Sequence, residues 1–229
     1  MKVRQLLIAS VGLVLAIPAI AGSPFSENWD SYPTGQSMHG VGGWHGWDGN
    51  AAATAFTSNA QAQSSPNSIA ISPTSDLVHE FSGYNTGQVT VTAWSYVPSS
   101  TIGQQYFIML NTYADGGPYN WSTELLFENG VLTNDGSGAT FPLVNDAWTE
   151  LRIEIDFDAD TQTFYYDGNF FDQTSWVDGV SGGGVANLAA MDLFSNGATE
   201  VYWDDISIEP AGPTPVQESS WGAIKATFK

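Results

Sequence analysis

Hydrophobic and polar residues alternate along most of this chain with a period of two, which is the period of a β-strand whose two faces meet different surroundings. In residues 88–97 mostly aliphatic positions alternate with threonine and aromatic positions, and in residues 148–157 Leu, Ile and Phe alternate with charged residues. Helical periodicity is missing between Pro24 and Pro210. Both segments therefore predict strands with one buried and one solvated face.

Eight further segments have the length and composition of strands, and turn sequences separate many of them. They are residues 25–32, 68–71, 77–81, 106–112, 123–127, 163–166, 189–194 and 201–208. Residues 106–112 are apolar on both faces, which predicts a central strand. Pairs such as Asn129-Gly130 and Asp167-Gly168 are typical of hairpin turns. The chain therefore predicts an all-β protein, a single antiparallel two-sheet sandwich of the jelly-roll kind.

The first 21 residues have the pattern of a secretory signal peptide. Lys2 and Arg4 precede an apolar run from Leu6 to Ile20, and the last residues of this segment are small enough for signal peptidase. We expect cleavage after Ala21 and a secreted protein, at the cell exterior, on the cell surface or in the periplasm. A retained membrane anchor is the alternative, which is disfavoured because the run is short and is interrupted by a serine and a proline.

The composition changes again near the C-terminus. Residues 210–220 are rich in proline and predict a linker that ends a domain of residues 22–209. Residues 221–229 place Trp221, Ile224 and Phe228 opposite two lysines, which predicts a short amphipathic tail. Such a tail either docks on a partner or on a second copy of the chain, or is a disordered end.

The charge of the chain limits the ligands that it can bind. All 24 Asp and Glu residues lie between Pro24 and Trp221, where Arg152 is the one Lys or Arg residue, and the net charge is −19. Such a domain repels nucleic acid, anionic lipid and acidic polysaccharide, so neutral ligands and divalent cations remain. Cysteine is absent, so stability must come from the core, from aromatic packing or from a bound metal.

Several segments resemble strands of secreted jelly-roll domains. A Trp opens the alternating strand of residues 148–157, and residues 163–168 end in aromatic residues and an Asp-Gly turn, as in the hairpins of concanavalin-like and laminin-G-like domains. Residues 25–32 and 201–208 look like the first and last strands of bacterial carbohydrate-binding modules. The resemblance implies a concanavalin-like jelly roll, a fold that lectins, glycosidases and lyases share.

The same resemblance implies a structural calcium ion between the first and last strands. In many carbohydrate-binding jelly rolls, acidic side chains of these two strands hold the ion. The matching residues here are Glu27, Asp30, Asp204 and Asp205. Carboxylate oxygens suit calcium, and the scattered histidines argue against zinc.

Two long loops, residues 42–50 and 111–121, combine aromatic residues with Gly, Asp and Asn. They are the candidate ligand-binding segments. We expect indole and phenol faces to stack on sugar rings and the polar side chains to bind hydroxyl groups. The predicted ligand-binding residues are Trp44, Trp47, Asp48, Tyr113, Asp115 and Trp121. The alternative is that these aromatic residues plug the ends of the sandwich.

One row of carboxylates raises the possibility of catalysis. Glu154, Asp156 and Asp158 occupy alternate positions of one strand, a spacing similar to that in laminarinase-type glycosidases. Asp158 is one methylene shorter than the Glu of that motif, and Arg152 on the same face is expected to neutralise the row.

The sequence therefore predicts a secreted, non-catalytic module that binds neutral glycans. A glycoside hydrolase or lyase of the same fold is the first alternative, and a structural matrix or adhesion protein that assembles through its tail is the second.

Overall fold

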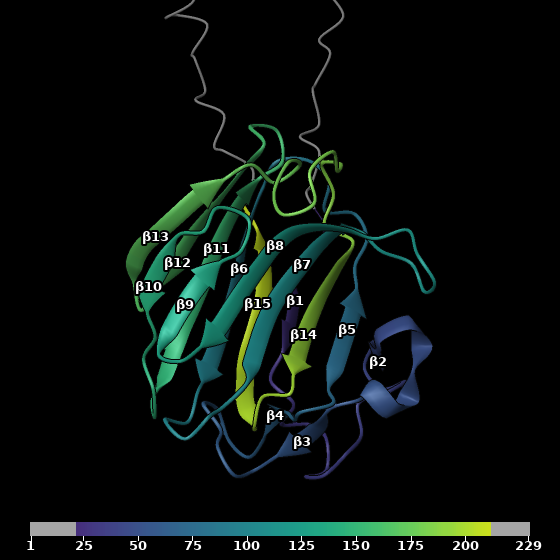
Figure 1. The fold of residues 1–229 in the computed structure, drawn as a ribbon. Coiled ribbons are helices and arrows are strands. Elements are labelled where there is room, and N and C mark those ends of the chain that lie inside the picture. The colour runs from purple at the N-terminus through teal and green to yellow at the C-terminus, as the bar shows by residue number, and fades with distance from the viewer. Residues whose placement is uncertain (1–21, 212–229) are drawn as a thin grey trace, which may run out of the picture.

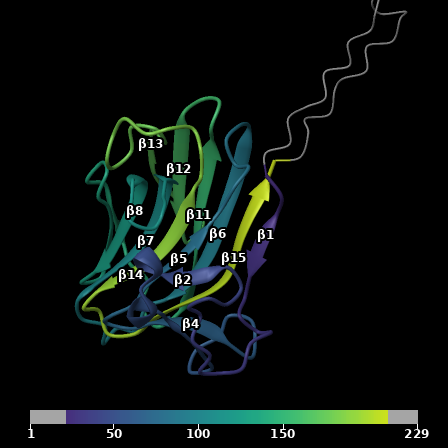
Figure 2. The same cartoon turned by 90° about the vertical axis from the view of Figure 1, so that its right-hand side faces the viewer.

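The computed structural model describes residues 22–211, which form two antiparallel β-sheets packed face to face (Figures 1 and 2). This arrangement confirms the predicted all-β, two-sheet jelly-roll sandwich. Two short 3₁₀ turns, η1 (Trp47–Gly49) and η2 (Ala51–Ala53), follow one another beside strand β2 (Trp44–Gly46). The predicted signal peptide (residues 1–21) and amphipathic tail (residues 221–229) lie outside the described residues.

Sheet A has eight strands in the order β13-β12-β11-β6-β15-β4-β3, and β1 pairs with β15 beside this path. Its strands are β1 (Phe25–Glu27), β3 (Phe56–Ser58), β4 (Ser68–Ile71), β6 (Gln88–Tyr96), β11 (Trp148–Asp156), β12 (Thr161–Tyr166), β13 (Asn169–Thr174) and β15 (Val201–Pro210). Because Phe25 pairs with Ile208, the two ends of the described chain lie side by side.

Sheet B has seven strands in the order β10-β9-β8-β7-β14-β5-β2, and it faces the viewer in Figure 1. Besides β2, its strands are β5 (Asp76–Glu80), β7 (Gln104–Thr112), β8 (Asn120–Glu128), β9 (Val131–Asn134), β10 (Thr140–Pro142) and β14 (Ala190–Asn196). The apolar strand predicted at residues 106–112 is β7, and it does lie in the middle of this sheet.

The main core fills the space between the sheets. Alternate residues of the long strands point into it, such as Val89 and Val91 of β6 and Phe107 and Met109 of β7. Its largest fully buried side chains are four indoles, those of Trp29, Trp44, Trp176 and Trp203. Burial of this much apolar surface is what replaces disulfides in the chain.

All ten predicted strands overlap strands of the structure, and five short strands were missed. The first predicted strand is too long, because β1 ends at Glu27 and Trp29 has a φ of 56°, which no strand adopts. The missed strands β2, β3, β9, β10 and β13 have three to six residues each. Segments this short show little alternation, which makes them hard to recognise from the sequence.

Candidate functional site: an aromatic cleft on sheet B

The outer face of sheet B carries a second apolar cluster, separate from the main core. Since Phe107 and Met109 of β7 point inward, Ile108 and Leu110 point outward, and outward residues of β5 and β14 join them. Aromatic side chains pack around these residues, namely Trp47, Tyr106, Tyr119, Trp121 and Phe194. Together they form a cleft of about 480 Å³, lined by Trp47, Asp76, Ile108, Tyr119, Trp121, Glu124, Val180, Asp192 and Phe194.

Trp47 stands at the centre of the aromatic group. Its ring lies 6.2 Å from that of Trp121, with only 13° between the two planes, and 4.9 Å from that of Tyr119. The ring of Tyr113 packs edge-on against it at 4.8 Å. Contacts of this kind hold the flat faces of Trp47 and Trp121 in defined orientations before any ligand arrives.

Local backbone chemistry places Trp47 there. It opens η1, and the next residue, Asp48, adopts a left-handed conformation with a φ of 55°, which Asp tolerates better than most residues. The side chain of Asn50 then accepts a hydrogen bond from the amide of Ala52 and caps η2.

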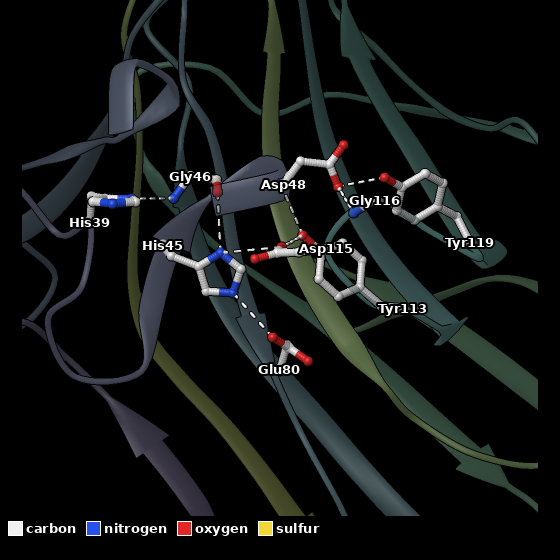
Figure 3. A network of polar contacts seen from close by, with 9 residues as sticks. All are labelled: His39, His45, Gly46, Asp48, Glu80, Tyr113, Asp115, Gly116 and Tyr119. Carbon is white, nitrogen blue, oxygen red and sulfur yellow. Dashed lines mark hydrogen bonds and ion pairs between the residues drawn. The ribbon is translucent and has the colours of Figure 1, made fainter. Parts of the chain in front are cut away.

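Hydrogen bonds join this segment to the loop before β8 (Figure 3). The Asp48 carboxylate accepts hydrogen bonds from the amide of Gly116, at 2.9 Å, and from the Tyr119 hydroxyl. The Tyr113 hydroxyl donates to Asp115, at 2.8 Å, and accepts from the Asp48 amide, at 3.1 Å. The hydrogen bond from Tyr119 lowers the pKa of Asp48, so this carboxylate stays ionised and keeps both contacts.

His45 of β2 supports the same loop from the other side (Figure 3). Its Nε2 lies 3.4 Å from a carboxylate oxygen of Glu80, and its Nδ1 lies 3.9 Å from Asp115 and within hydrogen-bond distance of the Gly46 carbonyl. The polar residues at this end of the cleft therefore position the aromatic ones.

Three carboxyl groups stand on the same outer face as the aromatic residues. Asp192 of β14 is paired with Ile108 of β7, and Ile108 is paired in turn with Glu124 of β8. Asp76 lies on β5, next to β14. Asp192 and Glu124 thus flank an apolar position on the floor of the cleft, and Asp76 lies on the strand beyond Asp192.

Burial changes the acidity of these groups. Desolvation is the largest cause in each case, and it raises the pKa of Asp76 to about 6, that of Asp192 well above its usual value, and that of Glu124 to a smaller extent. The negative charge of Asp76 further raises the pKa of Asp192. The Oδ1 atoms of both residues are buried and have no hydrogen-bond partner among the described residues.

The structure corrects the sequence prediction at Trp44. This side chain is entirely buried in the main core, where it packs against Trp29 and His79, so it offers no face to a ligand. Its position on β2 turns it inward, whereas Trp47 lies three residues further on, in η1, and faces the cleft.

The other predicted ligand residues do meet in one place. Trp47 and Trp121 line the cleft, whereas Asp48, Tyr113 and Asp115 form the hydrogen bonds that join its loops. Their roles therefore differ, since two residues present faces and three position them.

Sequence reasoning missed the three carboxyl groups of the cleft. Asp192 lies within a predicted strand, between Met191 and Leu193, and an acidic residue in such apolar surroundings is a candidate for a functional site. This acidic residue within an apolar strand was the sequence feature that could have indicated the site. Alternation also turns Glu124 outward, but only the sheet order shows that the two acids flank the same residue of β7.

The predicted catalytic row lies on the other sheet. Glu154 and Asp156 point outward from β11 of sheet A, and Arg152 donates a hydrogen bond to Glu154 while its guanidinium covers the ring of Tyr165 at 3.9 Å. Asp156 accepts a hydrogen bond from Gln88 at 2.6 Å, and Asp158 in the following turn accepts one from Thr86. These carboxylates are therefore held by protein donors, away from the aromatic cleft.

Two of the four predicted calcium ligands share a hydrogen-bond donor. The carboxylates of Asp30 and Asp205 both accept hydrogen bonds from the Ser64 hydroxyl, at 3.3 and 2.9 Å. Asp204 instead accepts hydrogen bonds from the amides of Gln63 and Ser64, and burial raises its pKa to about 7.

Glu27 accepts hydrogen bonds from the Trp29 amide and the Tyr32 hydroxyl. Within residues 22–211, no group of three or more His, Cys, Asp or Glu side chains is arranged to hold a metal ion. The oxygen donors suit calcium, but only Asp30 and Asp205 converge on one point, so the calcium site stays a prediction.

A hollow of about 600 Å³ lies on sheet A, between β1, β15 and β6. Its walls are mostly polar, and Trp94 and Tyr32 are its aromatic residues. It lacks the parallel indoles of the cleft on sheet B, which is why we regard the latter as the candidate ligand site.

Comparisons with known proteins identify the fold. No protein-family model matches the chain, and no curated protein matches its sequence. Among solved structures, a carbohydrate esterase of the Shiga toxin-encoding bacteriophage phi24B has a TM-score of 0.54 and 16% identity, over 82% of this chain and 97% of that one.

Two larger proteins contain a similar domain. The binding domain of Paraclostridial Mosquitocidal Protein 1 has a TM-score of 0.53 and 13% identity, over 86% of this chain and 50% of that one. A sialidase has a TM-score of 0.53 and 8% identity, over 84% of this chain and 19% of that one. This chain thus spans half of the first protein and less of the second, and identities this low show a shared jelly-roll sandwich and nothing finer. Within the described part of the chain, no helix is long and apolar enough to cross a membrane.

Proposed function

We propose that the protein binds neutral glycans in the cleft on sheet B. The observation that carries this proposal is the pair of nearly parallel indoles of Trp47 in η1 and Trp121 in β8, which lie side by side in one cleft. Sugar rings present flat faces of C–H groups to such indoles, while their hydroxyl groups bind nearby carboxylates and amides. Tyr119 and Phe194 extend the aromatic wall so that more than one sugar ring has a partner.

The charge of the cleft supports a neutral ligand. Its ionisable lining residues are Asp76, Glu124, Asp192 and Tyr119, and Arg152, the one Lys or Arg residue between positions 22 and 211, lies on the other sheet. A uronic acid or a sulfated sugar would therefore meet like charge with no cation to offset it. The same point argues against lyase chemistry on acidic polysaccharides, because nothing in the cleft would stabilise a second negative charge.

The similar structures agree with a glycan ligand at the level of class. One of them is described as a carbohydrate esterase and another as a sialidase, and both names refer to action on carbohydrates. The predicted signal peptide fits a protein that meets polysaccharides outside the cell.

Affinity electrophoresis in gels that contain single polysaccharides tests the proposal. The wild-type protein should be retarded by at least one of mixed-linkage glucan, xylan, galactomannan and starch. Retardation should fall at least tenfold in Trp47→Ala and Trp121→Ala, because each variant removes a stacking face. Trp94→Ala, which changes a partly exposed indole on sheet A, is the matched control and should bind as the wild type does. Binding that survives both cleft substitutions would contradict the proposed site.

A further inference from the structure

We propose that the cleft also cleaves the glycan that it binds, with Asp192 as the general acid and Glu124 as the general base of a glycoside hydrolase. This inference rests on the proposed glycan site, but it assigns a reaction to residues that binding alone does not require. The positions of the two acids in the sheet support it. Both acids point outward from sheet B into one cleft, and they stand on opposite sides of Ile108.

The register sets the spacing of the two acids. Asp192 and Glu124 belong to β14 and β8, which are separated by β7 alone. Neighbouring strands lie about 4.8 Å apart, so the two backbone positions are roughly 10 Å apart. Hydrolysis with inversion requires carboxyl groups about 6.5–9.5 Å apart, which leaves room for a water molecule beside the sugar, whereas retention requires about 5 Å. The arrangement favours inversion.

Asp192 has the surroundings of a group that keeps a proton. Its side chain is 2% exposed, it lines the cleft, and its Oδ1 has no hydrogen-bond partner among the described residues. The nearest ionisable neighbour is Asp76 on β5, and Glu124 adds a weaker negative field from β8. The negative charge of Asp48 in turn raises the pKa of Asp76. Asp76 and Glu124 are both acidic, so each disfavours a negative charge on Asp192.

Glu124 has a different environment. It is half-buried on β8, and Asp135 in the turn after β9 is the acid that, after burial, raises its pKa. It therefore loses its proton more easily than Asp192 does. Two carboxyl groups whose surroundings separate their acidities in this way are suited to act as an acid and a base at the same pH.

The reaction follows from these positions. The Asp192 carboxyl group gives its proton to the glycosidic oxygen as the bond between that oxygen and C1 of the sugar breaks. Glu124 takes a proton from a water molecule, and the water oxygen forms the new bond to C1. The products are a free hydroxyl group on the leaving sugar and a hemiacetal of inverted configuration. Exchange with solvent then returns a proton to Asp192 and removes one from Glu124.

The aromatic residues would position the sugar for this step. Trp47 and Trp121 lie at one end of the cleft and Phe194 also lines it, with the acids between β5 and β8. Rings stacked on these faces on either side of Ile108 would bring a glycosidic oxygen over the floor that the two acids flank.

Release of reducing ends from the polysaccharide that the full chain binds tests the inference. We expect cleavage by the wild-type protein and a loss of about 10²- to 10⁴-fold in Asp192→Asn and in Glu124→Gln, with retardation in affinity gels kept. Glu154→Gln, a carboxylate on sheet A, is the matched control and should cleave normally. Proton NMR of the first product should show inversion at the anomeric carbon.

The possible failures are distinct. A polysaccharide that is bound but not cleaved contradicts hydrolysis and leaves the binding proposal standing. Unchanged cleavage in either acid variant, or retention of configuration, contradicts the assigned roles. Absence of binding to every neutral polysaccharide contradicts both proposals. Because Asp192 is buried, circular dichroism melts of its variant accompany the assay, and Glu124→Gln, at a more exposed position, gives an independent measurement.

Discussion

The Asp48 carboxylate accepts a hydrogen bond from the hydroxyl of Tyr119, and through it the two aromatic loops of sheet B form one wall. The same carboxylate binds the Gly116 amide, so Asp48 fixes the loop that leads into β8. We expect Asp48→Ala to weaken glycan binding roughly tenfold, because Trp47 and Tyr119 would lose their preorganised positions. Isothermal titration with the oligosaccharide of the bound glycan measures this change. Asp158→Ala, on the far sheet, is the control, and equal affinity in both variants would show that the contact has no role in binding.

Trp44 and Trp47 lie close in sequence and should respond oppositely to truncation. Trp44 is entirely buried among core residues, so Trp44→Ala should lower the free energy of unfolding by about 3–5 kcal/mol. Trp47→Ala should cost much less stability and should abolish most glycan binding. Urea unfolding and affinity electrophoresis of the two variants separate these effects. A stable Trp44→Ala protein with lost binding would reverse the assignment.

The buried acids of the cleft should give the protein an unusual dependence on pH. Burial raises the pKa of Asp76 to about 6, whereas Asp in the unfolded chain titrates near 3.9. The folded state therefore holds this proton more tightly, and the stabilisation that results is complete below about pH 4 and is lost as the pH rises through 6.

Thermal melts between pH 4 and pH 8 measure this effect as a difference between two proteins. Asp76→Asn should resemble the wild type near pH 4 and gain on the order of 2 kcal/mol relative to it at pH 8. The comparison cancels contributions from acids that do not interact with Asp76, such as Asp204, whose pKa is raised in the same direction. Parallel stability curves for the two proteins would show that the environment of Asp76 does not oppose its ionisation.

The predicted calcium site can be tested directly by thermal melts. If Asp30 and Asp205 share an ion in place of the Ser64 hydroxyl, 10 mM calcium should raise the melting temperature by several degrees, and a chelator should reverse the gain. Asp205→Asn should remove the response. Glu27→Gln should keep most of it, because Glu27 is engaged by Trp29 and Tyr32. Melts that are the same with calcium and with chelator would exclude the site.

Local sequence patterns were sufficient to predict the fold class and the central strands. Period-two alternation is a local property, since each residue of a strand faces the side opposite to its neighbours, so β6, β11 and the apolar β7 could be recognised from their own residues. The sequence also determined the charge limit on ligands, because composition alone excludes a cationic surface. The two aromatic loops were recognisable for the same reason, as local clusters of Gly, Asp and aromatic residues.

Which of these residues come together in a site depends on the three-dimensional arrangement of the strands. Trp44 and Trp47 look alike in sequence, but one packs into the core and the other lies on the cleft, because a short strand and a 3₁₀ turn orient them differently. Glu154 belongs to the more conspicuous row of acids, yet its strand lies in sheet A, beside Arg152. Asp192 and Glu124 are far apart in the chain and face one another across β7 only because of the order of strands in sheet B. Strand order depends on long-range pairing, which local alternation does not encode.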